Sequence, residues 1–87
     1  MATLYRANGT ATPVKPKKGK QFSIKELQDF VGGHVELIPI PGHYLVVNEA
    51  GRLLELEYNS QATRLVHQFG YDYVVGDAVY IECDQID

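Results

Sequence analysis

The sequence has a single cysteine, no tryptophan and no long apolar run. With Cys83 alone, no disulfide can form within the chain, and a lone cysteine is typical of proteins from a reducing compartment. The apolar stretches are far shorter than the roughly 20 residues that a membrane span needs. The N-terminus lacks the basic and apolar regions of a signal peptide. We therefore expect a cytoplasmic protein without a membrane segment.

The chain is long enough for one domain. We expect a single domain over residues 1–87, with a folded core at 3–83 and a polar tail at 84–87. A chain of this length buries a modest share of its surface, so its stability should be marginal. Because small domains often gain stability by oligomerising, a homodimer is one expected state.

The two parts of the chain carry opposite charge. Residues 1–25 hold six cations and no acid, a net charge of +6, whereas residues 26–87 hold all eleven acids against Arg52 and Arg64, a net charge of −9. The lysines at 15–20 could attract a phosphate, but the acidic remainder would repel a nucleic-acid backbone. We therefore expect a solvated loop at 15–20 and do not expect nucleic-acid binding.

The N-terminal part predicts a β-hairpin and a helix. Residues 4–14 have the pattern of a hairpin whose Asn8-Gly9 pair favours a type I′ turn. Ser23-Ile24-Lys25-Glu26 has the spacing of a capping box, and Gly32-Gly33 is a helix stop. Within this helix, apolar residues recur at helical spacing on one face. They are Ile24, Leu27, Phe30 and Val31.

The remaining elements alternate between short strands and one more helix. We expect strands at 34–40, 43–48 and 52–58, a helix from Asn59 or Ser60 to about 68, and a strand at 74–83 with a bulge at Gly76-Asp77. The order is ββ-α-βββ-α-β. It predicts an α+β fold: an antiparallel, strongly curved sheet or partly open small barrel of five to six short strands with two short helices.

No motif for catalysis or for a metal is evident. The spacing of His34, His43 and His67 matches no zinc motif, and the predicted hairpin separates the first two by on the order of 20 Å. Cys83 has no basic neighbour and is best explained as a small buried hydrophobe. The serines are explained as helix caps. We therefore predict no catalytic residue, no metal and no cofactor.

One cluster keeps an enzymatic alternative open. The predicted 34–49 hairpin would place His34 opposite about Glu49, with Glu36 close by on the same face. Two carboxylates and a histidine could perform acid–base chemistry. The competing interpretation, which we favour, is a charged sheet edge that prevents aggregation.

Four segments, taken in order, resemble a known family. They are FSIKELQDFVGGHVE at 22–36, VVNEAGRL at 46–53, NSQAT at 59–63 and DYVVGD at 72–77. Their order and spacing are similar to those of the domain of unknown function 3846 family, over roughly residues 3–82. The resemblance implies an origin in a phage, a plasmid or another mobile element, and no known enzymatic activity. It implies no ligand.

The polar residues of these segments have two interpretations. They either form turns and helix ends or converge on one pocket. As candidate ligand-binding or partner-binding residues we take Glu36, Asn48, Glu49, Arg52, Asn59, Thr63 and Asp77.

The leading functional hypothesis is a non-enzymatic binding protein of a mobile element, which engages a host protein or assembles with itself. The acidic body, the six tyrosines and the short edge strands favour such a role. The alternative is capture of a small anionic ligand, such as a signalling nucleotide, in a counter-defence role. Its base could stack on a tyrosine, and an arginine or the lysine segment could bind its phosphate. The residues concerned are Tyr5, Tyr58, Tyr71 and Tyr73, with Arg6, Arg52 and Arg64.

Overall fold

A computed structural model describes residues 2–86 of the chain. Five strands and two α-helices follow one another as β1 Ala2–Tyr5, β2 Ala11–Val14, α1 Ile24–Val31, β3 Val35–Ile40, β4 His43–Asn48, α2 Ser60–His67 and β5 Ala78–Glu82, with a final 3-10 helix η1 at Cys83–Gln85. The predicted α+β class is confirmed. The element order is ββ-α-ββ-α-β, one strand fewer than expected.

The strands form one open antiparallel sheet. Its order is β2-β1-β5-β4-β3, and every ladder within it is antiparallel. In the described part of the chain, β2 pairs only with β1 and β3 only with β4, so the sheet has two edges. The sheet is therefore not closed into a barrel.

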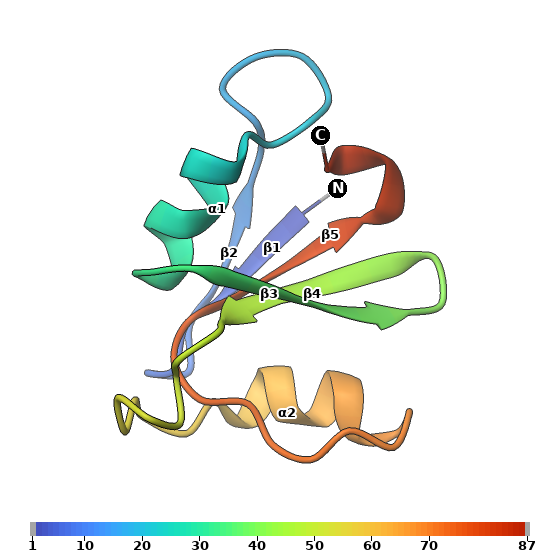
Figure 1. Cartoon of the computed structure of the whole chain (residues 1–87). Coiled ribbons are helices and arrows are strands. Elements are labelled where there is room, and N and C mark those ends of the chain that lie inside the picture. The colour runs from blue at the N-terminus through green and yellow to red at the C-terminus, as the bar shows by residue number, and fades with distance from the viewer. Residues whose placement is uncertain (1, 87) are drawn as a thin grey trace.

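The two helices cover opposite faces of this sheet (Figure 1). Side chains alternate along a strand, so neighbouring residues of β4 face different helices. Val46 packs into the cluster that includes Leu27 of α1, whereas Leu45 and Val47 pack into the cluster that includes Val66 of α2. The middle of the sheet is thus buried on both faces, which explains the nearly continuous apolar sequence of β4.

The hairpin of β1 and β2 forms as predicted, but its turn differs. The type I′ turn needs positive φ at Asn8 and Gly9, and only Gly9 has it, at 97°. The Arg6 amide donates to the Thr10 carbonyl at 2.9 Å, and the Gly9 amide donates to the Arg6 carbonyl at 3.0 Å. Three residues, 7–9, therefore lie between the bonded pair Arg6 and Thr10, one more than in a type I′ hairpin.

Helix α1 begins and ends where the sequence predicts. Ser23 and Glu26 form the capping box, and Gly32 adopts φ 78° at the C-cap. The predicted apolar face is wrong at Ile24, which is 56% exposed. Its place over the sheet is taken by the fully buried Phe22, whose ring centroid lies 6.0 Å from that of Phe30.

The strand predicted at 52–58 is absent from the sheet. Residues 49–55 form turns instead, in which the Leu54 amide donates to the Ala50 carbonyl at 2.9 Å and the Leu56 amide to the Gly51 carbonyl at 3.0 Å. Glu55 has φ 55°, which a strand does not accommodate. Local turn bonds therefore override the alternation of leucine and glutamate that suggested a strand.

The C-terminal region also differs from expectation. The last strand is shorter than the predicted 74–83, and Gly76 and Asp77 precede it rather than forming a bulge within it. Cys83 lies in η1 and is exposed, not buried. After η1 the chain lies against the core, because the Phe22 amide donates to the Gln85 carbonyl at 2.6 Å and Ile86 packs on the α1 cluster. Asp87 lies outside the described residues.

Among residues 2–86, no helix combines the length and the apolar character required to cross a bilayer.

The capping box makes stability depend on pH. Backbone hydrogen bonds from Ser23 and then Lys17 lower the pKa of Glu26 from its ordinary value of 4.5. Because the folded pKa lies below the unfolded one, this stabilisation is complete above pH 4.5 and is lost as the pH falls through the folded pKa.

We predict that Glu26→Gln removes this contribution. Urea unfolding of wild type and variant at several pH values should show a stability difference that is largest above pH 4.5 and shrinks in more acidic solution. A difference that stays constant with pH would show that the carboxylate does not contribute through its charge.

Candidate functional site

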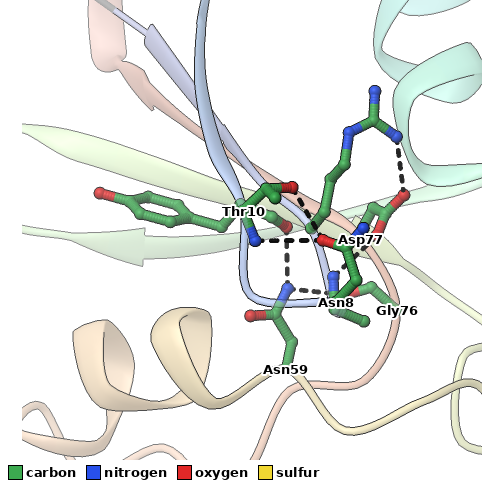
Figure 2. Close-up of polar contacts among 8 residues, drawn as sticks. Asn8, Thr10, Asn59, Gly76 and Asp77 are labelled. Carbon is green, nitrogen blue, oxygen red and sulfur yellow. Dashed lines mark hydrogen bonds and ion pairs between the residues drawn. The ribbon is translucent and has the colours of Figure 1, made fainter.

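Asn59, one of the predicted site residues, is a structural junction. Its side chain is buried, and its oxygen accepts from the Ala62 amide at 3.0 Å, which caps α2. Its amide nitrogen donates to the carbonyls of Tyr5 at 2.8 Å and Gly76 at 2.9 Å (Figure 2). One side chain thus joins the start of α2, the end of β1 and the segment that leads into β5.

Asp77 holds the hairpin loop to the same junction. It accepts from the Ala7 amide at 2.9 Å and lies 3.6 Å from the Arg6 guanidinium (Figure 2). Gly76 before it has φ 78°, a conformation that other residues rarely adopt, and a Cβ atom there would lie 2.7 Å from Cδ1 of Leu56, so glycine is strongly favoured at this position. The Gly76-Asp77 motif is therefore explained by architecture.

Thr63 and Asn48 also satisfy buried backbone groups. The Thr63 hydroxyl accepts from the Val74 amide at 2.9 Å and fastens α2 to the segment before β5. Asn48 donates to the Val31 carbonyl at 3.1 Å and accepts from the Ala50 amide at 2.8 Å, which joins the end of α1 to the turn after β4. Of the seven candidates, these two and the previous pair have structural roles.

The other three candidates line one open cleft. It encloses about 610 Å³ between the β3–β4 hairpin, the turns after β4 and the 71–75 segment. Its charged lining is Glu36, Glu49, Arg52 and Asp72, and its apolar lining includes Ile38, Val47, Val66 and Val74. Asn48 also borders it. Three of the seven sequence candidates thus share one cleft with Asp72, a residue that the sequence did not indicate.

Arg52 fastens the two walls of this cleft together. Its guanidinium donates to the Tyr73 carbonyl at 2.9 Å, lies 3.8 Å from the Asp72 carboxylate and sits 4.1 Å above the centre of the Tyr73 ring. Farther along, the Tyr71 hydroxyl donates to the Pro39 carbonyl at 3.2 Å. The 71–75 segment is thus held against both the turns and β3.

The histidine of the proposed acid–base cluster lies elsewhere. The register confirms that His34 is opposite Glu49, whose amide donates to the His34 carbonyl at 2.9 Å. However, Glu36 and Glu49 line the cleft, whereas His34 borders a separate shallow hollow beside Gly32. No group of three or more potential metal-binding side chains occurs within the described residues.

An apolar rim adjoins the cleft. Among residues 2–86, seven large hydrophobic side chains are exposed, and six of them belong to the 49–58 and 69–75 loops on the α2 side of the sheet (Figure 1). Leu53 is 86% exposed and lines the cleft together with Tyr71 and Tyr73, and the Tyr58 ring lies 6.3 Å from that of Tyr73. We call Leu53, Tyr58, Tyr71 and Tyr73 the loop patch.

The sequence indicated the loop patch only in part. The sequence pattern places Leu53 in a strand, and it indicates Tyr58, Tyr71 and Tyr73 as stacking partners for a nucleotide and, with the other tyrosines, as interface residues, without locating them beside one cleft. The signal that could have located the patch is the turn sequence Asn48 to Gly51, which places the next leucines on a surface loop.

The fold and the site define a small α+β domain with an open, mainly acidic cleft and an apolar rim. The family model for the domain of unknown function DUF3846 matches residues 5–87. The chain belongs to this family, as the four sequence segments suggested. No curated protein and no solved structure matches the chain.

The junction role of Asn59 can be tested by replacement. Asn59→Ala removes the cap and two buried donors, so we expect a loss of about 2 to 4 kcal/mol in unfolding free energy, measured in urea. Asn59→Asp keeps the cap acceptor but turns an oxygen towards two carbonyls, so it should destabilise at least as strongly at neutral pH.

Asn8→Ala is the control for this experiment, because Asn8 is exposed and bonds only within its own turn. It should cost less than about 1 kcal/mol. An Asn59→Asp variant as stable as wild type would contradict the junction role, because it would show that Asn59 contributes to stability only by capping α2.

Proposed function

We propose that this protein is a non-enzymatic binding domain that engages another protein, or a second copy of itself, through the loop patch and the adjoining cleft. The observation that carries the proposal is the concentration of exposed tyrosine and leucine on two loops beside one cleft. Aromatic side chains are enriched at protein interfaces, and a contiguous exposed apolar surface favours association. In line with the expected mobile-element origin, the partner would be a host protein in the cytoplasm.

The patch has the support that an interface needs. Arg52 fixes Tyr73 from one side, and the Tyr71 hydroxyl is anchored on β3, so two of the four side chains are held in place before binding. Ordering these side chains in advance lowers the entropy lost on association. Leu53 has no such anchor in the described contacts and would become buried on binding.

The chain offers a matched control for testing the patch. Leu53→Ser and Ile24→Ser each remove one exposed aliphatic side chain, but Ile24 lies on α1, away from the patch. The immobilised wild-type protein and both variants would be used to capture partners from a bacterial lysate. The captured protein would then be purified and its affinity measured.

We expect Leu53→Ser to weaken binding about tenfold or more, as for a hot-spot side chain, and Ile24→Ser to leave it unchanged. Both variants should keep the wild-type melting temperature, because exposed substitutions cost little stability. Sedimentation of the three proteins measures their oligomeric state and so tests whether the partner is a second copy of the chain. Equal loss of binding in both variants, or no loss in either, would contradict it.

The alternative, capture of an anionic nucleotide, finds its best support outside the cleft. Three carboxylates line the cleft, and its one cation is already bound by Tyr73 and Asp72. A shallower hollow along α2 is lined by Tyr58 and Tyr73 together with Arg64 and His67. There, a base could stack on a tyrosine while the arginine binds phosphate.

A thermal-shift screen against nucleotides tests this alternative. If it holds, a nucleotide should raise the melting temperature of the wild-type protein, by an amount that grows with ligand concentration. Arg64→Gln should abolish this shift, and Arg6→Gln, which lies at the hairpin loop, should preserve it. Absence of stabilisation by any nucleotide would eliminate the alternative.

A further inference from the structure

The cleft runs beside an open edge of the sheet. Within residues 2–86, β3 pairs with β4 on one side only. The Glu49 amide donates to the His34 carbonyl, which marks this pair as a hydrogen-bonded pair of the antiparallel ladder. Because such pairs alternate, Glu36 and Ile38 also point their backbone groups towards β4. The backbone groups of Val35, Leu37 and Pro39 therefore point outwards.

One end of this edge is closed. Pro39 has no amide hydrogen, and its carbonyl already accepts the Tyr71 hydroxyl. The amides and carbonyls of Val35 and Leu37 remain as the outward-facing groups. This arrangement suits a short added strand and prevents a longer one, since the ladder cannot continue past the proline.

The charge of the adjoining cleft favours an added strand with basic side chains. Glu36 comes from β3, Glu49 from the turn after β4 and Asp72 from the opposite wall, whereas Arg52 is the one cation of the lining. Arg52 is itself bound to the Tyr73 carbonyl and ring and lies 3.8 Å from the Asp72 carboxylate, so Glu36 and Glu49 are the carboxylates that this arginine does not pair with. The groups left to meet a ligand are thus mainly carboxylates, which attract lysine or arginine.

The apolar floor and the aromatic rim of the cleft can contact the aliphatic stem and the guanidinium plane of a basic side chain. Ile38, Val47 and Val66 form an apolar floor that could cover the aliphatic stem of a lysine or an arginine. The contact of Arg52 with Tyr73 shows that a guanidinium can stack on this rim, and Tyr71 offers a second ring. In a bound strand, every second side chain would point into the cleft.

We propose that an extended, lysine- or arginine-bearing segment of a partner protein adds to the β3 edge as a short strand and places its basic side chains among Glu36, Glu49 and Asp72. This proposal rests on the proposed function and names the chemistry of the partner. The basic segment at 15–20 of a second copy is a poorer occupant. The Lys17 amide is bound to the Glu26 carboxylate at 3.0 Å, which holds that segment at the start of its own α1.

Labelled eight-residue peptides provide the test. The probes are a peptide of alternating lysine and valine, its glutamate–valine counterpart, and a lysine–valine peptide with N-methylated backbone amides. Fluorescence anisotropy measures their binding to wild type, Glu36→Gln and Glu49→Gln. Asp84→Asn is the matched control, because Asp84 is also exposed but borders a hollow beside the lysine segment instead.

We expect the lysine–valine peptide to bind, the glutamate–valine peptide not to bind, and N-methylation to abolish binding by removing the strand donors. Each cleft variant should weaken binding about twofold to fivefold, as for partly exposed ion pairs, and Asp84→Asn should not. Binding should be stronger at about 50 mM than at about 500 mM salt, because screening weakens the charge attraction.

Equal binding of the acidic and basic peptides, or equal weakening by Asp84→Asn, would overturn the proposal. Self-association that Glu36→Gln abolishes would overturn the assignment to a separate protein.

The two proposals fail independently. Peptide binding that is absent while lysate capture still depends on Leu53 would refute strand addition alone, and intact peptide binding without any dependence of capture on Leu53 would refute the role of the loop patch.

Discussion

The buried side chain of Asn59 is the interaction on which the arrangement of the α2 side depends. Its three hydrogen bonds join α2, the end of β1 and the segment before β5, which are far apart in the sequence. The backbone amide of Asn59 also donates to the Val74 carbonyl at 2.9 Å. One helical turn later, the Thr63 hydroxyl accepts from the Val74 amide. The 71–75 wall of the cleft therefore starts from a rigid base.

This base explains how a small domain can present exposed aromatic side chains without losing its fold. The sheet is buried on both faces where β4 and β5 lie between the helices, and the loop patch lies outside this packed region. Leu53 and Tyr73 therefore contribute little to the core, while Arg52 and Tyr71 keep their loops in place. The residues that form the core are therefore largely different from those of the loop patch.

The charged cleft and the apolar rim form one continuous surface. The carboxylates of Glu36 and Asp72 face the same opening from opposite walls, and the apolar rim continues from it towards α2. A partner that places a basic strand in the cleft would also cover Leu53 and Tyr71, which line the same opening. Charge would then govern which segment binds, and apolar contact would supply most of the affinity.

Local signals in the sequence determined several elements. The capping box of Ser23 and Glu26, the stop at Gly32 and the N-cap at Asn59 act within a few residues, so their hydrogen bonds are the same in any fold that contains the helices. The β3–β4 register likewise follows from a short turn between branched residues, and it placed Glu36 and Glu49 correctly on one face. These features could be predicted because the interacting groups are close in sequence.

Only the tertiary structure decided the rest. The alternation of Leu54, Glu55 and Leu56 is compatible with a strand, but the sheet has no place for it, and turn bonds within 49–56 satisfy the backbone instead. Whether Asn59 or Arg52 serves the fold or the site depends on partners many residues away, which no local pattern specifies. The cleft exists because long-range hydrogen bonds bring Tyr71 and Tyr73 against the hairpin and the turns, and such contacts are decided by the packing of the whole chain.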